Sequence, residues 1–343
     1  MSLLVIDPAT DATPWQAKAP DGSASTLLHI RAAPAPPAAT ALTIDAAAGA
    51  TGHFIERTLP APVDLTNFTD IQVWLTSDRQ ATGTATQPFF LELRIGSNAA
   101  AINTPANQWH RYLPATQSHA RELALMSVDD LPVQAKTAVT TVRVTCVDGT
   151  APFICRIERI TALTEQILAD IDAALKARLD GKIAADGLPV PALIAELGAV
   201  LPNPPYLRIT QFDVRAADER SPQVPTRSDY TDSGFRLRPP RATFDALYEV
   251  ECISDARATE AAALTYLLGD FAPRTALSVN DWPMTCELVP IPAALGATRP
   301  ERVIVWLRVL ASTRRTTAAH DAKPPTKGAD VTVGQAPTIP ALA

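Results

Sequence analysis

Alternation of apolar and polar residues dominates the first half of the chain. Short runs with a period of two predict strands that bury one face, and Pro, Asp, Asn and Gly between the runs predict turns. The expected strands span residues 26–31, 40–45, 52–59, 70–77, 88–97, 108–114, 140–147 and 153–160. About eight strands with no convincing helix predict an antiparallel two-sheet sandwich of the jelly-roll type.

From Thr161 onward the apolar spacing becomes helical. Ile167, Leu168, Ile171, Leu175 and Leu179 form one stripe of an expected helix. Thr161 or Thr164 is the expected cap of its start, and Gly181 suits the turn after its end. A second, short helix is expected between Pro191 and Gly198.

Residues 244–274 change period from two to 3.6. Alternate residues of the first part are apolar, namely Phe244, Ala246, Tyr248, Val250 and Cys252. This pattern predicts a half-buried strand. After Asp255, an expected N-cap, helical spacing relates Leu264, Leu267, Leu268 and Phe271, and Pro273 marks the stop. A strand is therefore expected to lead directly into a helix.

Further strands are expected at residues 206–214, 243–253, 284–290 and 302–311. The last is apolar on both faces, which is typical of a strand inside a covered sheet or at an oligomer interface. The chain is thus expected to be multidomain. An all-β jelly-roll sandwich (1–160) is followed by an α+β domain with helices on one face of an antiparallel sheet (161–312) and an extended C-terminal arm (313–343).

Composition supports two domains and excludes few functions. The 343 residues are 47% hydrophobic, enough for two ordinary cores. The 31 prolines and 14 glycines favour stiff connections, and the net charge of -6 gives no general reason to expect nucleic-acid or membrane affinity. The N-terminus lacks the features of a signal peptide and no run reaches membrane-spanning length, so we expect folding in a cytoplasm.

The four cysteines lie in expected strands without the spacing of a zinc site. Buried thiols are the expected state, because cysteine acts as a small apolar core residue. Cys146 and Cys155 flank the turn VDGTAP, so an alternative is that they face each other across a hairpin and form a disulfide in an oxidising medium.

The first half resembles the carbohydrate-binding-module or galactose-binding-like jelly roll. The segments LPAPVDLTNFTDIQVWLTSD, NQWHRYLP, VTTVRVTCVDG and FICRIERITAL carry the likeness, which spans about residues 25–162. It implies sugar binding by exposed aromatic faces, with Trp74, Phe90, Trp109 and Tyr112 as candidates for glycan stacking. The alternative is that these rings fill the sandwich or a subunit contact.

The second half resembles the tail-terminator or tail-completion proteins of long-tailed bacteriophages and phage-like injection systems. The leading helix, PPYLRITQF, RATFDALYEVECISDARATEAAALTYLLGDFAPR and RVIVWLRVLA carry this likeness over residues 161–312. It implies a ring of identical subunits, a hexamer, that caps the tail tube and contacts neck or connector proteins. The expected location is then the virion, assembled in the host cytoplasm, with the sandwich as an outward decoration domain.

Two segments are candidates for contacts with other molecules. Residues 215–242 form a long polar excursion with candidate contact residues Arg215, Arg220, Arg227, Tyr230, Phe235, Arg236, Arg238 and Arg241. It is either an arm on a neighbouring subunit or tube ring, or a flexible surface loop. Residues 313–343 have the composition of an extended arm, in which DVTVG could add a strand to an exposed sheet edge.

No motif for catalysis, cofactor binding or metal binding occurs, and the five histidines are isolated from one another. We therefore expect neither an enzyme nor a bound cofactor or metal. The leading hypothesis is a structural virion protein, the tail terminator or neck subunit. The alternative is a carbohydrate- or receptor-binding virion module mounted on an α+β anchor, which would bind surface glycans through its sandwich.

Overall fold

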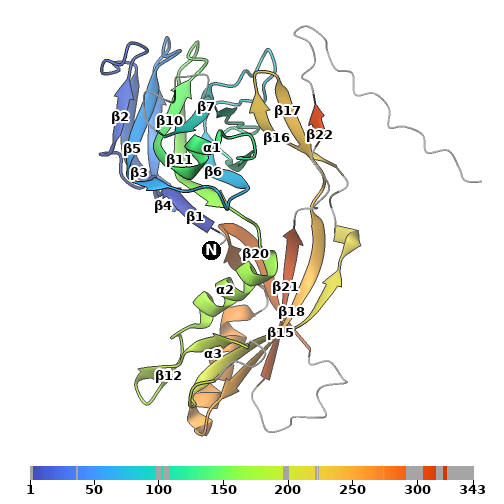
Figure 1. The fold of residues 1–343 in the computed structure, drawn as a ribbon. Coiled ribbons are helices and arrows are strands. Elements are labelled where there is room, and N and C mark those ends of the chain that lie inside the picture. The colour runs from blue at the N-terminus through green and yellow to red at the C-terminus, as the bar shows by residue number, and fades with distance from the viewer. Residues whose placement is uncertain are drawn as a thin grey trace, which may run out of the picture.

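The computed structural model describes residues 3–35, 38–97, 102, 109–195, 201–220, 222, 224–272, 274–290, 304–313 and 320–322. Figure 1 shows a β-sandwich followed by an α+β domain, and a hairpin of the second half that reaches back to the first. The predicted multidomain architecture is confirmed.

The sandwich has two antiparallel sheets. One has the order β3-β4-β11-β6-β9, with β1 also paired to β11, and the other the order β2-β5-β10-β7-β8. The strands are β1 (Leu3–Asp7), β2 (Trp15–Lys18), β3 (Leu28–Ala35), β4 (Ala38–Ala46), β5 (Phe54–Val63), β6 (Asp70–Ser77), β7 (Leu91–Gly96), β8 (His110–Tyr112), β9 (Arg121–Ser127), β10 (Val139–Cys146) and β11 (Phe153–Leu163). The short helix α1 (Val133–Thr137) was not expected from the sequence, nor were β1, β2 and β9.

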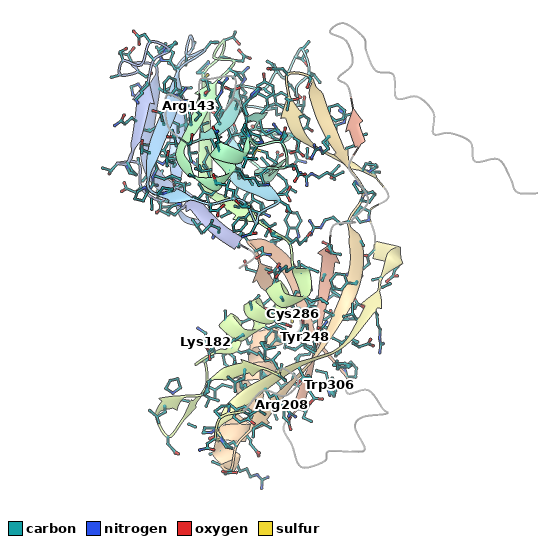
Figure 2. The ribbon with its side chains drawn as sticks, in the orientation of Figure 1. Arg143, Lys182, Arg208, Tyr248, Cys286 and Trp306 are labelled. Carbon is teal, nitrogen blue, oxygen red and sulfur yellow. The ribbon has the colours of Figure 1, made fainter. Side chains whose placement is uncertain are left out.

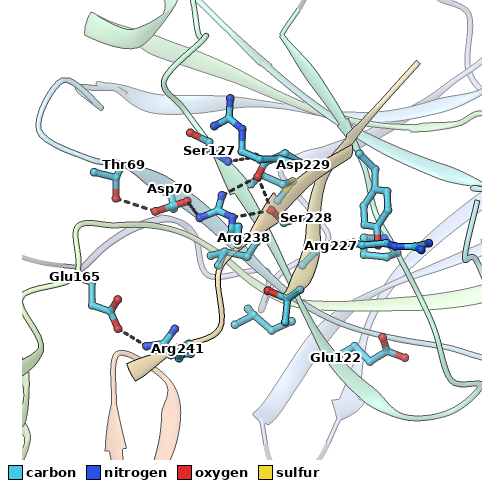
Figure 3. A pocket seen from close by; sticks show the side chains of 18 of the residues that line it. Thr69, Asp70, Glu122, Ser127, Glu165, Arg227, Ser228, Asp229, Arg238 and Arg241 are labelled. Atoms are coloured by element: carbon cyan, nitrogen blue, oxygen red, sulfur yellow. Dashed lines mark hydrogen bonds and ion pairs between the residues drawn. The ribbon is translucent and has the colours of Figure 1, made fainter. Parts of the chain in front are cut away.

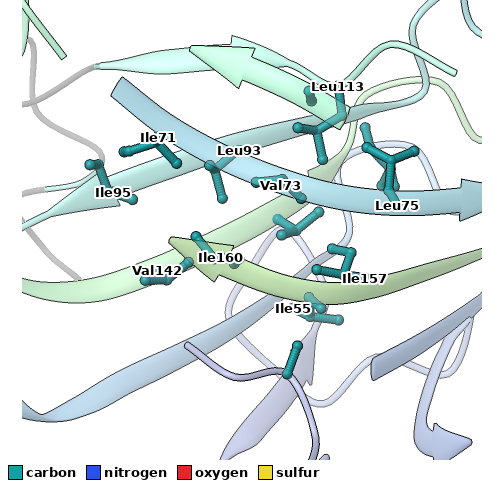
Figure 4. Close-up of a cluster of buried hydrophobic side chains, with 14 of the residues drawn as sticks. Ile55, Ile71, Val73, Leu75, Leu93, Ile95, Leu113, Val142, Ile157 and Ile160 are labelled. Carbon is teal, nitrogen blue, oxygen red and sulfur yellow. The ribbon is translucent and has the colours of Figure 1, made fainter. Parts of the chain in front are cut away.

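The inner faces of both sheets form one apolar core. Ile71, Val73 and Leu75 of β6 point into it, as the alternation predicts (Figure 4). Gln72 and Trp74 therefore belong to the outer face of the same strand, because successive side chains of a strand point to opposite sides. The last strand, β11, extends to Leu163, slightly beyond the expected domain end at 160.

All four cysteines are buried thiols, as expected. Cys146 lies in β10 and Cys155 in β11, and these strands belong to different sheets. The alternative that they face each other across a hairpin is therefore wrong, because residues 147–152 cross from one sheet to the other. Burial raises the pKa of Cys146 to about 11 and of Cys155 to about 12.

The second domain is a six-stranded sheet of order β14-β15-β18-β21-β20-β19 with two helices on one face. Its elements are α2 (Ile167–Leu179), β12 (Ala184–Ala185), β13 (Leu188–Pro189), β14 (Ala192–Ile194), β15 (Tyr206–Ala216), β18 (Ala242–Ile253), α3 (Arg257–Phe271), β19 (Thr275–Val279), β20 (Trp282–Val289) and β21 (Ile304–Thr313). Tyr248 and Cys286 lie in the core between sheet and helices (Figure 2). The short helix expected after Pro191 is wrong, because Ala192–Ile194 pairs in parallel with β15.

The helix starts also differ from expectation. Thr161 belongs to β11, and α2 begins after Gln166 without a side-chain cap. The residue before α3 is Ala256 rather than Asp255. On α3 the buried residues are Thr259, Ala263, Leu267 and Phe271, whereas Leu264 and Leu268 are 36% and 46% exposed. Burial of α2 follows its predicted stripe, and Gly181 adopts φ 67° in the turn that follows.

Strand β21 lies inside the sheet, between β18 and β20, as its two apolar faces predict. Val305, Leu307 and Val309 face the helices. On the opposite face Trp306 is buried, with its ring edge-on to Phe212 at 4.5 Å between centroids.

The long excursion is largely structured. After the 3-10 turn η3 (Asp218–Arg220) it forms a hairpin of β16 (Thr226–Thr231) and β17 (Gly234–Arg238), with β22 (His320–Ala322) paired to β17. The hairpin contacts β8 and β9 of the sandwich. Of the expected C-terminal arm only Thr313 and residues 320–322 are described, so DVTVG lies outside the described residues. Within the described part of the chain, no helix is long and apolar enough to cross a membrane.

Candidate functional site

Arg238 of the hairpin joins the two halves of the chain. Its Nη1 lies 2.9 Å from Oδ1 of Asp70 in β6, and its Nη2 donates to Asp229 Oδ2 at 2.7 Å. Nε of the same guanidinium donates to Ser228. Figure 3 shows Arg238 between the two carboxylates. Asp70 and Asp229 are both buried, so this guanidinium lies between two buried carboxylates that come from different domains, and Arg111 Nε lies 3.6 Å from the second of them.

A β-bulge aims Asp229 at the sandwich. The ladder between β16 and β17 shifts register between Ser228 and Thr231, and Asp229 has a φ of 54°. A bulge bends its strand and redirects one side chain, and Asp tolerates this left-handed backbone better than most residues. The redirected carboxylate accepts the backbone N–H of Ser127 in the edge strand β9.

The charge on Asp229 is held by its surroundings. Burial acts to raise its pKa, but the Arg238 charge and the hydrogen bonds from Ser228 and Ser127 outweigh burial. The resulting pKa lies below the ordinary value. The seam between the β16–β17 hairpin and the sandwich therefore contains a carboxylate that is ionised at neutral pH.

The tip of the hairpin contacts β8. Tyr112 donates its phenolic O–H to Asp232, and His110 Nε2 lies 3.4 Å from the same carboxylate. Beside this contact the Phe89 ring stacks on Tyr112 at 5.1 Å and meets Tyr230 of the hairpin at 5.0 Å. Both domains thus contribute to an aromatic cluster at this end of the seam.

A second bridge is made by the turn between β19 and β20. Asn280 and Asp281 have φ values of 50° and 66°, as the two central residues of a type I′ hairpin turn do. Asp281 pairs with Arg159 of β11 at 2.8 Å, and Asn280 donates to Asp170 of α2 at 2.6 Å. The turn is therefore fixed on both sides, and it holds Trp282 against the sandwich.

Trp282 completes a row in which two tryptophan rings lie between two guanidinium groups. The Arg121 guanidinium lies 3.7 Å from the Trp74 ring centroid, and Trp74 lies 6.0 Å from Trp282. Arg241, paired with Glu165, lies 5.9 Å from the Trp282 centroid. Two members come from each domain, and cation–π contacts of this kind stabilise such a junction.

Between the two bridges lies a cleft of about 1080 Å³. Every residue of the edge strand β9 lines it, and a strand of seven residues is about 20 Å long. Four aromatic side chains also line it, Trp74, Tyr112, Tyr230 and Trp282. This volume matches the upper end of the range for small-molecule sites.

Charge in the cleft is balanced. Five arginines and five carboxylates line it. Most are already paired, as Arg121 is with Glu158 and Arg241 with Glu165. Glu122 instead accepts the backbone N–H groups of Thr116 and Gln117. The described residues contain no group of His, Cys, Asp and Glu side chains arranged to hold a metal ion.

The four residues predicted to stack on glycans have different environments. Phe90 and Trp109 belong to the sandwich core, so neither offers a face to a ligand. Trp74 lines the cleft but is only 7% exposed and already carries Arg121 on its ring. Tyr112 lines the cleft with one face on Phe89. The alternative, that such rings fill the sandwich, holds for Phe90 and Trp109.

The residues predicted as an inter-subunit arm make contacts within their own chain. Arg215 pairs with Asp213, and Arg220 with Asp245. Arg227 lies over Phe235 at 4.7 Å from the ring centroid, and Arg236 Nη1 is 3.6 Å from Asp129. Arg227, Tyr230, Arg236, Arg238 and Arg241 line the cleft. The surface on which this arm lies is thus the sandwich of the same chain.

Sequence reasoning missed Trp282 and Arg121. Trp282 is the most exposed ring of the cleft, at 40%, and it directly follows the pair Asn280–Asp281. An Asn-Asp pair before a strand favours a tight hairpin turn, which was an available signal that an aromatic side chain stands at a hairpin tip. Arg121 belongs to β9, where the adjacent charged residues Arg121 and Glu122 interrupt the alternation of apolar and polar positions, so no strand was expected there.

No protein-family model matches the chain, and no curated protein matches it. Among solved structures it is similar to a family 11 carbohydrate-binding module from Clostridium thermocellum in complex with a β-1,3-1,4-mixed-linked tetrasaccharide. The two share 10% identity and a TM-score of 0.33, over 48% of this chain and 96% of the module.

Two other similar structures are also binding modules. A xylan-binding module, CBM15, has 13% identity and a TM-score of 0.30, over 48% of this chain and 97% of the module. A family 30 carbohydrate-binding module has 9% identity and a TM-score of 0.30, over 44% of this chain and 82% of the module. The structural neighbours named here are thus carbohydrate-binding modules, and at these scores the likeness carries no information on a ligand.

Proposed function

We propose that this protein binds a saccharide in the cleft between its two domains. The observation that carries the proposal is the combination, in one cleft of about 1080 Å³, of four aromatic side chains with five arginines and five carboxylates. Pyranose rings present apolar C–H faces that pack on aromatic rings, and hydroxyl groups that bond to charged side chains. The carbohydrate-binding part of our alternative hypothesis is therefore the one we favour.

The ligand we propose is neutral and elongated. Equal numbers of acidic and basic side chains give the cleft no net charge to attract an anionic polymer. The aromatic side chains come from four separate elements around a cleft lined by the whole of β9, which suits an oligosaccharide better than a single sugar. Trp282 is the principal stacking residue, because its ring is the most exposed of the four.

Affinity electrophoresis tests this function directly. We expect gels that contain mixed-linkage β-glucan, xylan or agarose to retard the full chain, with retardation by at least one of them unchanged between 50 and 500 mM salt. A polyanion such as heparin should retard it only at low salt, if at all. Failure of every neutral polysaccharide to retard the protein would refute the proposal.

We keep the tail-terminator function as a second proposal for the C-terminal half. Its basis is the resemblance of the sequence; α2, β15, β18, α3, β20 and β21 occur in the expected order, with β12–β14, the β16–β17 hairpin and β19 inserted between them. It predicts a ring of six subunits in a virion, in contact with tube and neck proteins, with the sandwich outside. Native mass spectrometry and negative-stain images test it: a hexameric ring supports it, and a monomer at micromolar concentration contradicts it.

A further inference from the structure

The β16–β17 hairpin forms one wall of the cleft although it belongs to the other domain in sequence. Residues 226–230 with Arg236 and Arg238 line the cleft beside β9. Trp282 and Arg241 line it as well, but the β19–β20 turn holds Trp282 and Glu165 holds Arg241. Without the hairpin, the cleft would lose Tyr230 and its wall beside β8 and β9.

The hairpin is mechanically separate from the sheet of its own domain. It forms its own three-stranded sheet with β22, and none of its strands pairs with the six-stranded sheet. Pro225 precedes it, and Pro239 and Pro240 follow it. Proline lacks an N–H and cannot continue a strand ladder, so these residues separate the hairpin from β15 and β18.

Side chains, not a strand ladder, hold the hairpin on the sandwich. In the described structure β9 pairs only with β6, and β8 only with β7. The contacts across the seam include those of Arg238 with Asp70, Asp229 with the Ser127 amide, and Asp232 with Tyr112. Arg111 Nε also lies 3.6 Å from Asp229, Arg236 pairs with Asp129, and the Tyr230 ring meets Phe89. A few charged contacts of this kind form and break together more readily than a ladder of backbone hydrogen bonds.

We propose that the hairpin is a movable wall, that Arg238 is the positioning residue that holds it closed, and that a bound saccharide and hairpin docking stabilise each other. The inference rests on the proposed function for the saccharide and on geometry for the docking. Because a ligand that touches both walls binds only the closed form tightly, it shifts the population toward that form. By reciprocity, docking strengthens ligand binding by the same factor by which the ligand strengthens docking, so a variant whose hairpin is mostly undocked binds the ligand more weakly.

The first part of the test follows docking without a ligand. The backbone N–H of Ser127 reports on it, because its acceptor is Asp229. In Arg238→Met we expect hydrogen exchange at Ser127 to accelerate at least tenfold, and proteolysis at the exposed Val224 to increase. Arg220→Met is the matched control, because Arg220 pairs with Asp245 outside the cleft and should leave both readouts unchanged.

The second part adds the polysaccharide that the wild-type chain binds. We expect Arg238→Met to bind it at least tenfold more weakly, and saturation with it to slow exchange at Ser127 again. Asp70→Asn is the milder variant if Arg238→Met does not fold, because it removes the charged partner of Arg238 across the seam, and the same signs are expected. Wild-type exchange in Arg238→Met, or an undocked hairpin with unchanged saccharide affinity, would overturn the inference.

The two proposals fail in different ways. If no polysaccharide binds the wild-type chain, the proposed function and the coupling are both refuted, while the exchange data still decide whether Arg238 holds the hairpin. If the wild-type chain binds and Arg238→Met binds equally well, the function stands and the movable wall is refuted. In both cases the control must hold: the Ser127 amide of Arg220→Met must exchange at the wild-type rate, so that the effect of Arg238→Met is not a general effect of removing an arginine.

Discussion

Nη1 of Arg238 lies 2.9 Å from Oδ1 of Asp70, and this contact joins two strands, β6 and β17, that lie far apart in the sequence and belong to different domains. The Asp70 side chain is 3% exposed and that of Arg238 15%. A buried pair of this kind adds little net stability compared with apolar residues, but breaking it leaves an uncompensated charge. The Asp70–Arg238 pair is therefore expected to fix where the hairpin docks on the sandwich more than to stabilise the fold.

We predict a large coupling energy between these two residues. In a double-mutant cycle of Asp70→Asn and Arg238→Met, the two effects on the free energy of unfolding should be non-additive by about 1–3 kcal/mol, because removal of either partner strands the other. Urea unfolding of the four proteins measures it.

The matched cycle uses Asp129→Asn and Arg236→Met, whose atoms are 3.6 Å apart at the exposed rim. Its coupling should stay below about 0.5 kcal/mol, since exposed ion pairs contribute little. Equal coupling in both cycles would contradict the special role of Arg238.

Acid should release the hairpin through Asp229. The pKa of this group is lowered in the folded chain below the ordinary value of 3.8. Its stabilising contribution is therefore complete above the unfolded pKa and is lost as the pH falls through the folded pKa. The NMR shift of the Ser127 amide should stay constant from pH 8 to about pH 5 and change below about pH 4.

Asp229→Asn separates this titration from that of other carboxylates, because the amide oxygen still accepts a hydrogen bond but does not titrate. In this variant the Ser127 shift should vary little down to about pH 3. The same acid transition in both proteins would show that another group controls docking.

Substitution of two neighbouring leucines of α3 by alanine should affect stability to very different extents. Leu267 is fully buried and Leu268 is 46% exposed. Leu267→Ala should destabilise the protein by about 2–5 kcal/mol, whereas Leu268→Ala should change its stability by less than about 0.5 kcal/mol. Thermal unfolding checks both. A large loss in Leu268→Ala would mean that this exposed face is covered in solution, as a ring of subunits would require.

Periodicity predicted much of this molecule because it reports local geometry. The alternation of Ile71, Val73 and Leu75 predicted β6 with its bounds, and the stripe ending at Leu179 predicted α2. On α3 the same reasoning was partly right: Leu267 and Phe271 are buried as expected, but Thr259 and Ala263 complete the buried stripe in place of Leu264 and Leu268.

Relations between distant segments were beyond the sequence pattern. Spacing left open an alternative in which Cys146 and Cys155 face each other across a hairpin, but the chain crosses between sheets there. The sequence left the arginine-rich excursion open between an arm on a neighbouring subunit and a flexible loop. Its partner in the same chain, Asp70, has no sequence mark that distinguishes it from other strand-start carboxylates. Trp282 became a site residue only when the turn at Asn280 was placed against β11.

The central claim is that the cleft binds a neutral saccharide with Trp282 as its main aromatic contact. Titration calorimetry of the full chain and of Trp282→Ala with oligosaccharides of mixed-linkage β-glucan, xylan and agarose tests it most directly. We predict that one of them binds the full chain and that Trp282→Ala weakens this binding by about tenfold, roughly 1.4 kcal/mol, at a temperature at which both proteins are fully folded. Undiminished binding in Trp282→Ala, or no binding to any neutral saccharide, would contradict the account.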